Sequence, residues 1–310
     1  MARERVCRLP ATAKKRKLSR AKLGTWAFAY AVLALPIIYF FIFYVYVNFS
    51  SIALAFQSSK TGKLTFENFR FVWHELTRSG TDLFGVLKNT MTFWLLGWIM
   101  MPINIVVSFI LYKQIRGYKF FQTVFYLPSI ISAVVWMTAY KNFINPEGPL
   151  MRLFASMGFY KNGVPELLND SRYAFGAVIG SSVWLGIPSN MLIYCGSLCR
   201  IPHDVIEAAR LDGVGFWGEI RHVTFPLLGP LIATQVLLHC TTILNSSGNV
   251  LLLTEGKWGT STLNYWLYEQ VVVSGQVNIP SAMGLLMTLV TIPIVVLSRF
   301  LTRRIEDIEY

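Results

Sequence analysis

Residues 201–230 read IPHDVIEAARLDGVGFWGEIRHVTFPLLGP and form a polar stretch between two long apolar segments. Pro202 suits the first turn of a helix, and the carboxylate of Asp204 favours the positive N-terminal end of that helix. Gly213 can adopt the left-handed conformation that ends a helix. A second helical stretch, 216–222, follows it. The sequence therefore predicts an ordered loop of two short helices between the apolar segments.

The segments on either side of this loop are suited to a membrane. Of the 310 residues, 54% are hydrophobic and only 14% are charged, whereas a soluble domain carries about 25% charged residues. This composition excludes a disordered protein, a disulfide-stapled secreted domain and an ordinary cytosolic enzyme. A helix needs about 20 apolar residues to cross the hydrocarbon core. We expect an all-α polytopic membrane protein with six transmembrane helices, at 25–48, 89–111, 121–140, 174–198, 226–250 and 281–301.

The distribution of Lys and Arg predicts how these helices are oriented. The net charge is +12, and nine cations precede residue 23, directly before the first apolar segment. Placing both termini in the cytoplasm puts 18 cations inside and 10 outside, as the positive-inside rule requires. Nucleic-acid binding is disfavoured, because no basic groove with interleaved aromatic residues accompanies the tail.

These spans divide the chain into five parts. The first span is longer than a signal peptide requires and rich in Phe and Tyr, so we interpret it as an uncleaved anchor, although Ala53-Leu54-Ala55 resembles a cleavage site. Short helices are expected at 66–76 and 150–157 outside the membrane. The parts are a basic cytoplasmic tail (1–24), the first span (25–48), an extracytoplasmic segment (49–88), a five-helix core (89–301) containing the loop 201–226, and a cytoplasmic tail (302–310).

The sequence shows no pattern typical of an enzyme or a metal site. It lacks a phosphate-binding G-x-x-x-x-G-K-[ST] motif, an H-E-x-x-H motif and a nucleophile elbow. Cys195 and Cys199 are one helical turn apart, but no His, Asp or Glu stands beside them in the same apolar run. We therefore predict that the chain is not an enzyme and holds no metal or cofactor of its own.

Polar side chains concentrate in the fourth and fifth spans, where they are costly unless they line a cavity or pair with a neighbour. Trp184 could provide an aromatic face for a sugar ring, and Asn245 and Ser246 could provide hydrogen bonds to its hydroxyls. The alternative is that these residues only pack helices together. His239 could relay protons, but no intramembrane Asp or Glu accompanies it.

The loop also carries a family signature. Glu207-Ala208-Ala209, three further residues, Gly213, nine further residues and then Val223-Thr224-Phe225-Pro226 resemble the signature of binding-protein-dependent ABC importer permeases. The family pattern is E-A-A, three residues, G, nine residues, I-x-L-P. Val223 and Phe225 replace the usual Ile and Leu.

Further motifs are similar to the carbohydrate-uptake branch, and to the first of its two paired permeases. The resemblance covers about 85–310, whereas the preceding residues match only in layout. One departure lies at 246–257, where relatives often have a T-x-G-G-P turn. The motifs are Lys88-Asn89-Thr90, Phe125-Tyr126-Leu127-Pro128, Trp184-Leu185-Gly186-Ile187-Pro188, the segment 260–268 and Pro280-Ser281-Ala282-Met283-Gly284.

The resemblance implies a type I ABC importer permease in the bacterial plasma membrane. Its implied partners are a second homologous permease, two ATPase subunits that bind ATP and Mg²⁺, an extracytoplasmic sugar-binding protein and the sugar itself. The loop would dock on an ATPase subunit through Glu207, Ala208, Ala209, Asp212, Gly213 and Pro226. The substrate path would include Trp184, Leu185, Gly186, Ser189, His239 and Ser246, to which the polar pattern adds Asn245.

Three other functions are compatible with a polytopic protein. The chain could be an ABC importer permease for a solute other than a sugar, such as an amino acid or phosphate. An ion-coupled secondary transporter would need intramembrane charge, which spans two to six almost lack. A membrane-embedded enzyme would need a catalytic cluster near an interface, and the sequence contains none that we recognise.

Overall fold

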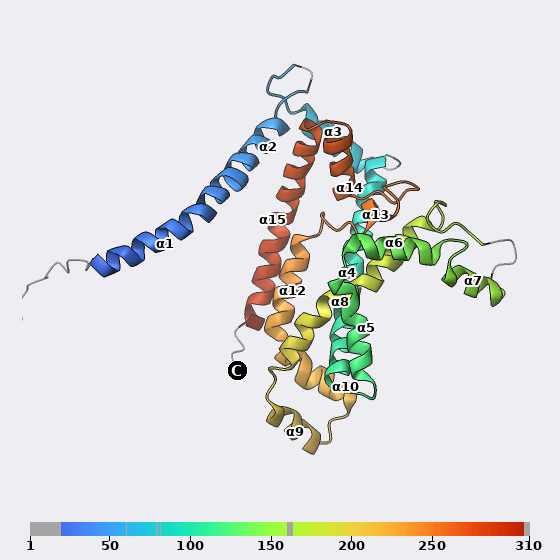
Figure 1. Ribbon diagram of the computed structural model, residues 1–310. Coiled ribbons are helices and arrows are strands. Elements are labelled where there is room, and N and C mark those ends of the chain that lie inside the picture. Colours follow the sequence, from blue (N-terminus) through green and yellow to red (C-terminus); the bar gives the residue numbers. More distant parts are fainter. Residues whose placement is uncertain (1–19, 60, 79, 81, 160–163, 307–310) are drawn as a thin grey trace, which may run out of the picture. The chain divides into compact units, whose positions relative to one another are not determined.

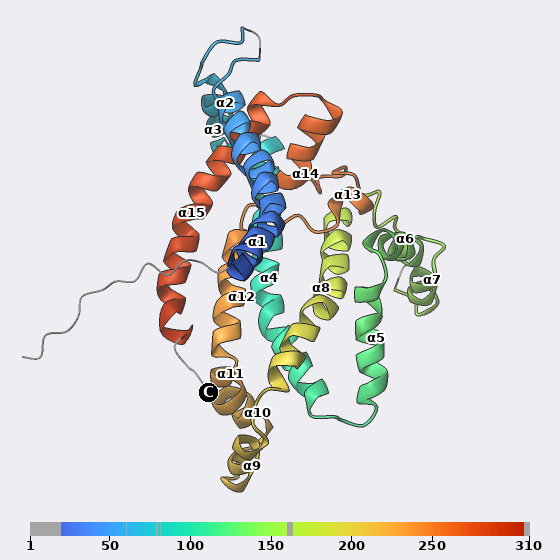
Figure 2. The same ribbon diagram turned by 60° about the vertical axis from the view of Figure 1, so that its left-hand side comes forward.

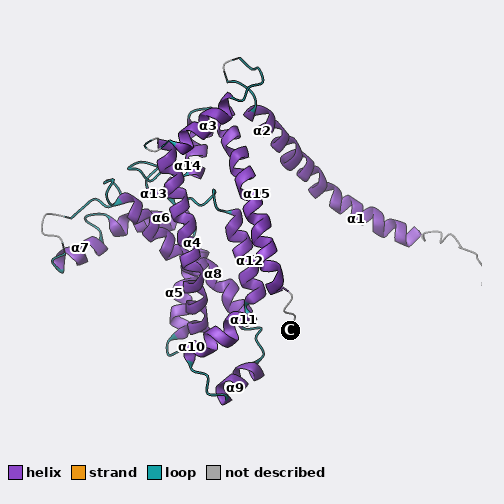
Figure 3. Ribbon diagram, turned by 180° about the vertical axis from the view of Figure 1, so that it is seen from behind, coloured by secondary structure: helices purple, strands orange, loops and turns teal. Residues whose placement is uncertain are grey.

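The computed structural model describes residues 20–306 except for 60, 79, 81 and 160–163. Residues 1–19 of the predicted tail 1–24 and residues 307–310 of the predicted tail 302–310 therefore lie outside the described residues. The chain divides into two compact units, Met1–Ala53 and Leu54–Tyr310. Apart from one isolated bridge between Gln57 and Leu64, the described residues form helices and turns (Figure 3).

From Arg20 onward, the first unit is a continuous helical run. It comprises α1 (Arg20–Tyr39), the π-helical segment η1 (Phe40–Tyr46) and the start of α2 (Val47–Ala55). The stretch Phe28–Ala55 is long and apolar enough to cross a membrane, and large apolar side chains are exposed along it. The helix therefore contains the predicted span 25–48 and continues through Ala53-Leu54-Ala55.

The second unit is built around long helices with shorter ones at their ends (Figure 1). Both helices expected outside the membrane form, as α3 and α7. The elements before the polar loop are α3 (Glu67–Thr77), α4 (Asp82–Tyr112), α5 (Tyr118–Ile130), α6 (Ala133–Ile144), α7 (Pro149–Ser156) and α8 (Ala174–Leu198). The later elements are α9 (His203–Leu211), α10 (Phe216–Glu219), η2 (Ile220–Thr224), α11 (Phe225–Leu227), α12 (Gly229–Thr241), α13 (Val250–Leu253), α14 (Leu263–Tyr268), η3 (Glu269–Val273) and α15 (Asn278–Glu306).

Among the described residues, four helices are long and apolar enough to cross a membrane, or up to six if each of two bent pairs counts as one span. The expected helix 121–140 is wrong as a single element, because the chain bends by 105° between α5 and α6. Pro128 lacks the N–H of a helical hydrogen bond, Ile131 is extended, and Ser132 starts α6 by accepting a hydrogen bond from the Val135 N–H. Hydropathy does not register this break because both sides are apolar.

The expected helix 226–250 is also wrong as a single element. A 72° bend separates Phe216–Leu227 from Gly229–Thr241, and α12 ends at Thr241. The hydroxyl of Thr241 donates to the Leu238 carbonyl and that of Thr242 to the His239 carbonyl, so side chains there compete for backbone acceptors. Turns follow up to α13, with Gly248 at a positive φ of 54°.

Three apolar clusters hold the second unit together. In Figure 2, α4 lies beside α8, and α12 lies beside α15. One cluster joins α3, α4, α14 and α15, a second joins α4, α6, α8 and α13, and a third joins α4 and α8 to the polar loop. Because α4 contributes to all three clusters, it is the central element of the unit.

The Lys88-Asn89-Thr90 motif fastens a distant loop to α4. The Asn89 Nδ2 donates to the carbonyls of Gly259 and Ser261 at 2.8 and 2.9 Å, and the Thr90 hydroxyl accepts from the Leu263 N–H at 2.9 Å. These bonds provide partners for backbone carbonyls and an N–H that have no partner within a helix. The motif therefore has a structural role at the start of α14.

We predict that Asn89→Ala destabilises this attachment. Two backbone carbonyls would lose their side-chain donor, which lowers the free energy of unfolding by about 1–3 kcal/mol. Thermal denaturation of the purified protein in detergent measures the loss. The matched control is Thr92→Ala, because the Thr92 hydroxyl bonds only within its own helix, to the Lys88 carbonyl. Equal melting temperatures for the two variants would contradict the prediction.

Candidate functional site

The polar loop forms the two short helices that the sequence predicts. Helix α9 begins directly after Pro202, and Asp204 lies in its first turn. Gly213 has a φ of +74°, and across it the Val214 N–H donates to the Ala209 carbonyl at 3.1 Å. This is the geometry of a glycine-terminated helix. Helix α10 then starts after Gly215.

The loop presents a mixed polar and apolar surface. Of the predicted docking residues, Ala209 is buried, while Glu207, Ala208, Asp212, Gly213 and Pro226 are exposed. Two large apolar side chains accompany them, with Leu211 89% and Trp217 69% exposed. Exposed apolar groups surrounded by polar residues are typical of a protein contact surface. The loop, which we call the docking loop (Ile201–Pro230), is therefore available to a partner.

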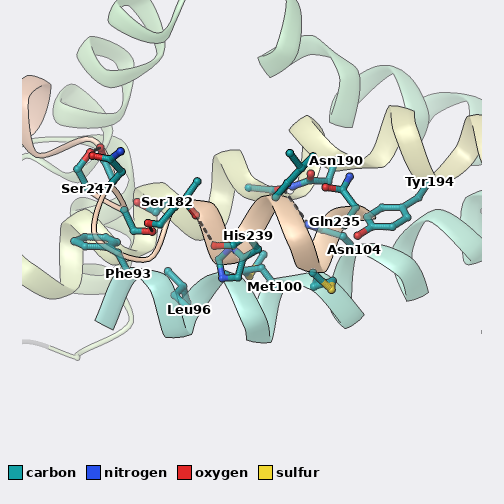
Figure 4. Close-up of a pocket in the computed structure, with 18 residues that line it drawn as sticks. Phe93, Leu96, Met100, Asn104, Ser182, Asn190, Tyr194, Gln235, His239 and Ser247 are labelled. Atoms are coloured by element: carbon teal, nitrogen blue, oxygen red, sulfur yellow. Dashed lines mark hydrogen bonds between the residues drawn. The ribbon is translucent and has the colours of Figure 1, made fainter. Parts of the chain in front are cut away.

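A cavity of about 470 Å³ lies between α4, α8 and α12, and the turns after α12 close one end of it (Figure 4). Eighteen residues line it, and none is Asp, Glu, Lys or Arg. Its polar groups are carboxamides, hydroxyls and one imidazole, and its aromatic groups include Phe93. A site of this size and chemistry suits a small uncharged polar ligand.

Helical spacing explains which residues of α8 reach the cavity. Ser182, Gly186, Asn190 and Tyr194 all line it, and they recur every four residues on one face of the helix. Trp184 is two residues from Gly186, which places it about 200° around the axis. It therefore cannot share the cavity with Gly186.

The structure divides the predicted substrate path between two cavities. Gly186, His239, Asn245 and Ser246 line the first cavity. Trp184 and Leu185 line a second, mainly apolar cavity of about 340 Å³, together with Trp136 and Tyr140 from α6. The expected pairing of Trp184 with Asn245 and Ser246 is thus not formed, and Phe93 is an aromatic residue near them instead. Ser189 lies on α8, but its side chain is outside the described residues.

His239 is fixed by contacts with α4. Its ring stacks on Trp94 at 5.8 Å between centroids and meets the edge of Trp98 at 5.1 Å. Its Nε2 is 2.9 Å from the Trp94 carbonyl, and the Trp94 indole donates to the His239 carbonyl at 3.1 Å. Because a carbonyl only accepts, Nε2 carries a proton. His239 therefore packs helices and lines the cavity at once.

Several residues of the first cavity are not part of the predicted site, and two of them are carboxamides, Asn104 and Gln235. Asn104 is 2% exposed, and its Nδ2 donates to the Gly186 carbonyl at 3.2 Å. The Asn104 Oδ1 has no hydrogen-bond partner among the described residues, so an acceptor remains open beside the cavity. Gln235 lines the same region from α12. A carboxamide inside an otherwise apolar helix is the signal that could have identified both residues.

Comparison with known proteins identifies the family. The family model described as "Binding-protein-dependent transport system inner membrane component" matches residues 95–307. The chain belongs to this family. The match includes the docking loop, α8, α12 and the part of α4 from residue 95 onward.

Two relatives and one solved structure are similar to this permease over much of its length. It is 25% identical over 272 residues to the lactose transport system permease protein LacF of Rhizobium radiobacter, covering 84% of this chain and 87% of that one. It is 26% identical over 190 residues to the galactooligosaccharides transport system permease protein GanP of Bacillus subtilis, covering 59% of this chain and 45% of that one. These relatives are transport permeases.

The permease also has the fold of a chain in a crystallised transporter. That crystal structure is of a bacterial ABC transporter involved in the import of the acidic polysaccharide alginate. The two chains have a TM-score of 0.80 at 23% identity, and the match covers 93% of this chain and 99% of that one. The likeness establishes the type I ABC importer permease fold.

Proposed function

We propose that the chain is the permease subunit of an ATP-driven ABC importer that moves a sugar or oligosaccharide across the bacterial plasma membrane. The observation that carries this proposal is the first cavity. It is uncharged, rich in carboxamides and hydroxyls, and built partly on α8 and α12, the helices on either side of the docking loop. The names of the relatives, a lactose and a galactooligosaccharide transport permease, support the same class of substrate.

The topology we propose has six spans with both termini in the cytoplasm. The bent pair of α5 and α6 counts as one broken span, and α12 with the turns that follow it counts as another, in keeping with the six apolar segments of the sequence. Irregular backbone at membrane depth is tolerated where it lines a cavity, and the turns after α12 do so. The excess of Lys and Arg on the side of the docking loop supports this orientation.

We propose that the permease works in an assembly. A second homologous permease would complete the path, and two ATPase subunits would bind ATP and Mg²⁺. The docking loop would contact one ATPase subunit through Glu207, Ala208, Asp212, Gly213 and Pro226, with buried Ala209 supporting that surface. An extracytoplasmic sugar-binding protein would deliver the substrate. This chain would hold no cofactor of its own.

The lining of the first cavity favours a neutral sugar over an acidic one. Carboxamides can both donate to and accept from sugar hydroxyls, and Asn104, Asn190, Gln235 and Asn245 supply them. A uronate would bring a carboxylate into a site whose eighteen lining residues include no Lys or Arg. Burying an unpaired carboxylate costs several kcal/mol.

Reconstitution tests both the proposed function and the proposed substrate class. The permease, its second permease, the ATPase and the binding protein are assembled in liposomes, and uptake of labelled oligosaccharides is measured with and without ATP. We expect ATP-dependent uptake of neutral oligosaccharides and none by this chain alone. Uptake of uronate oligosaccharides only would overturn the neutral class, while absence of any sugar uptake by the assembled complex would overturn the function.

Two substitutions test the substrate path. Asn245→Ala removes a carboxamide from the first cavity and should raise the sugar concentration needed for half-maximal uptake roughly tenfold, equivalent to about 1.4 kcal/mol. Trp184→Ala alters the second cavity and should lower transport with a smaller change in that concentration. Basal ATPase activity should be unchanged in both. An unaltered concentration dependence for Asn245→Ala would mean that Asn245 only packs.

A further inference from the structure

Lys113 and Glu219 form a buried ion pair between the end of α4 and the docking loop. The Lys113 ammonium contacts the Glu219 carboxylate, and the two side chains are only 17% and 7% exposed. By contrast, the side chains of the Lys257–Glu255 pair are 67% and 63% exposed. An exposed pair contributes little, but loss of one member of a buried pair leaves an uncompensated charge. Losing one member of the Lys113–Glu219 pair would therefore cost more than losing one member of the Lys257–Glu255 pair.

Aromatic packing fixes the pair on the α4 side. The Lys113 ammonium lies 5.3 Å from the centre of the Phe109 ring, and Phe109 meets the edge of Phe216 at 5.4 Å. The Lys113 N–H donates to the Phe109 carbonyl at 3.0 Å, and Gln114 then turns to a φ of 53°. Ile220 packs in the same apolar cluster as Phe109. The last turn of α4 and the segment α10–η2 are thus joined by both charge and apolar contact.

The segment α10–η2 is also attached to α9. Only Asp212–Gly215 separate α9 from α10 in the sequence, and α9 contacts η2. The Glu219 N–H donates to the Gly215 carbonyl at 2.9 Å. A displacement of α9 therefore reaches Glu219 through a short, hydrogen-bonded connection.

Along its middle, α4 forms a wall of the first cavity. Phe93, Gly97, Met100 and Asn104 all line the cavity from α4. Asn104 is nine residues from Lys113, roughly 14 Å along the helix axis. The helix is continuous from Asn104 to Tyr112, and the Lys113 N–H bonds to the Phe109 carbonyl, so a movement at Lys113 would reach the cavity wall.

We propose that the Lys113–Glu219 pair transmits movement of the docking loop to α4 and so couples ATP hydrolysis to opening of the cavity. Lys113 and Glu219 are then positioning residues for transport. The inference rests on the proposed function. It differs from a purely stabilising role, in which the pair would affect how much complex assembles but not how much sugar moves for each ATP hydrolysed.

The test measures sugar uptake and ATP hydrolysis together in liposomes that contain the assembled complex. Glu219→Gln keeps the shape of the side chain but removes its charge. We expect the number of sugars moved per ATP to fall roughly tenfold, within the range for residues that carry coupling, while ATP hydrolysis continues. The charge-swapped double variant Lys113→Glu with Glu219→Lys should recover at least half of the wild-type ratio. Glu255→Gln breaks the exposed pair and should leave the ratio unchanged.

A further variant covers the case in which Glu219→Gln does not assemble. Lys113→Met with Glu219→Leu leaves no buried charge and should fold. Apolar contacts are non-directional, so this variant should still move fewer sugars per ATP. A wild-type ratio in this variant, or in an assembled Glu219→Gln complex, would overturn the inference. A wild-type complex that hydrolyses ATP but moves no sugar would instead overturn the proposed function.

Discussion

Gly213→Pro is expected to abolish transport while leaving the permease in the membrane. Gly213 ends α9 at a φ of +74°, whereas the proline ring holds φ near −65°. The variant cannot form the turn that directs the chain from α9 to α10, so the exposed docking residues would point away from their partner. Uptake should fall below about one hundredth of the wild-type rate, the effect of losing roughly 2.7 kcal/mol or more at the contact.

Gly215→Pro is the matched control for this experiment. It lies two residues away in the same turn, and its φ of −72° already suits proline. We expect this variant to retain most of its uptake. Uptake and co-purification of the ATPase should be measured for both variants, together with the amount in the membrane. Normal uptake by Gly213→Pro would contradict the role of the docking loop.

Gly97→Val is expected to disrupt the packing of α4 against α12. A Cβ atom at Gly97 would overlap the imidazole of His239. That ring is held in place because it stacks on Trp94 and meets Trp98 edge-on. Because the ring cannot move aside, the helices must separate. Overpacking of this kind costs about 1–3 kcal/mol or more, and here it also distorts the cavity wall, so we expect transport to be lost.

The matched control is Gly85→Val, at a position on the same helix where an added Cβ meets no atom within 4 Å. Melting temperature in detergent and uptake in liposomes should both be close to wild type for this control. The double variant Gly97→Val with His239→Ala removes the clash and should regain most of the melting temperature. If it melts as low as Gly97→Val alone, contact with His239 is not the cause.

Local chemistry was sufficient for much of the fold. Long apolar runs predict helices because backbone groups cannot remain unpaired in hydrocarbon, and the four long helices of the described chain confirm this. The docking loop was equally predictable, since Pro202 and Gly213 act on the backbone within a few residues of themselves. The breaks at Ile131 and after Thr241 were missed, because hydropathy does not register competition for hydrogen bonds.

The residues of the candidate site were only partly predictable. The polar character of α8 and α12 is visible in the sequence, and Gly186, His239, Asn245 and Ser246 do share a cavity. Trp184 lines the second cavity instead, because it lies on a different face of α8 from Gly186. Asn104 is not part of the predicted site, because it follows an apolar run, 93–103, in a helix whose sequence gives no other indication of a cavity.

The long apolar helices, the docking loop and the family signature can be predicted from the sequence, because they depend on short-range spacing and hydrophobicity. Which distant residues meet depends on the tertiary structure. His239 bonds to Trp94 across 145 positions, and Lys113 at the end of α4 pairs with Glu219 in the docking loop. The physical reason is that such contacts depend on how helices pack and rotate against one another, and that packing is selected by the sum of many weak, non-directional contacts.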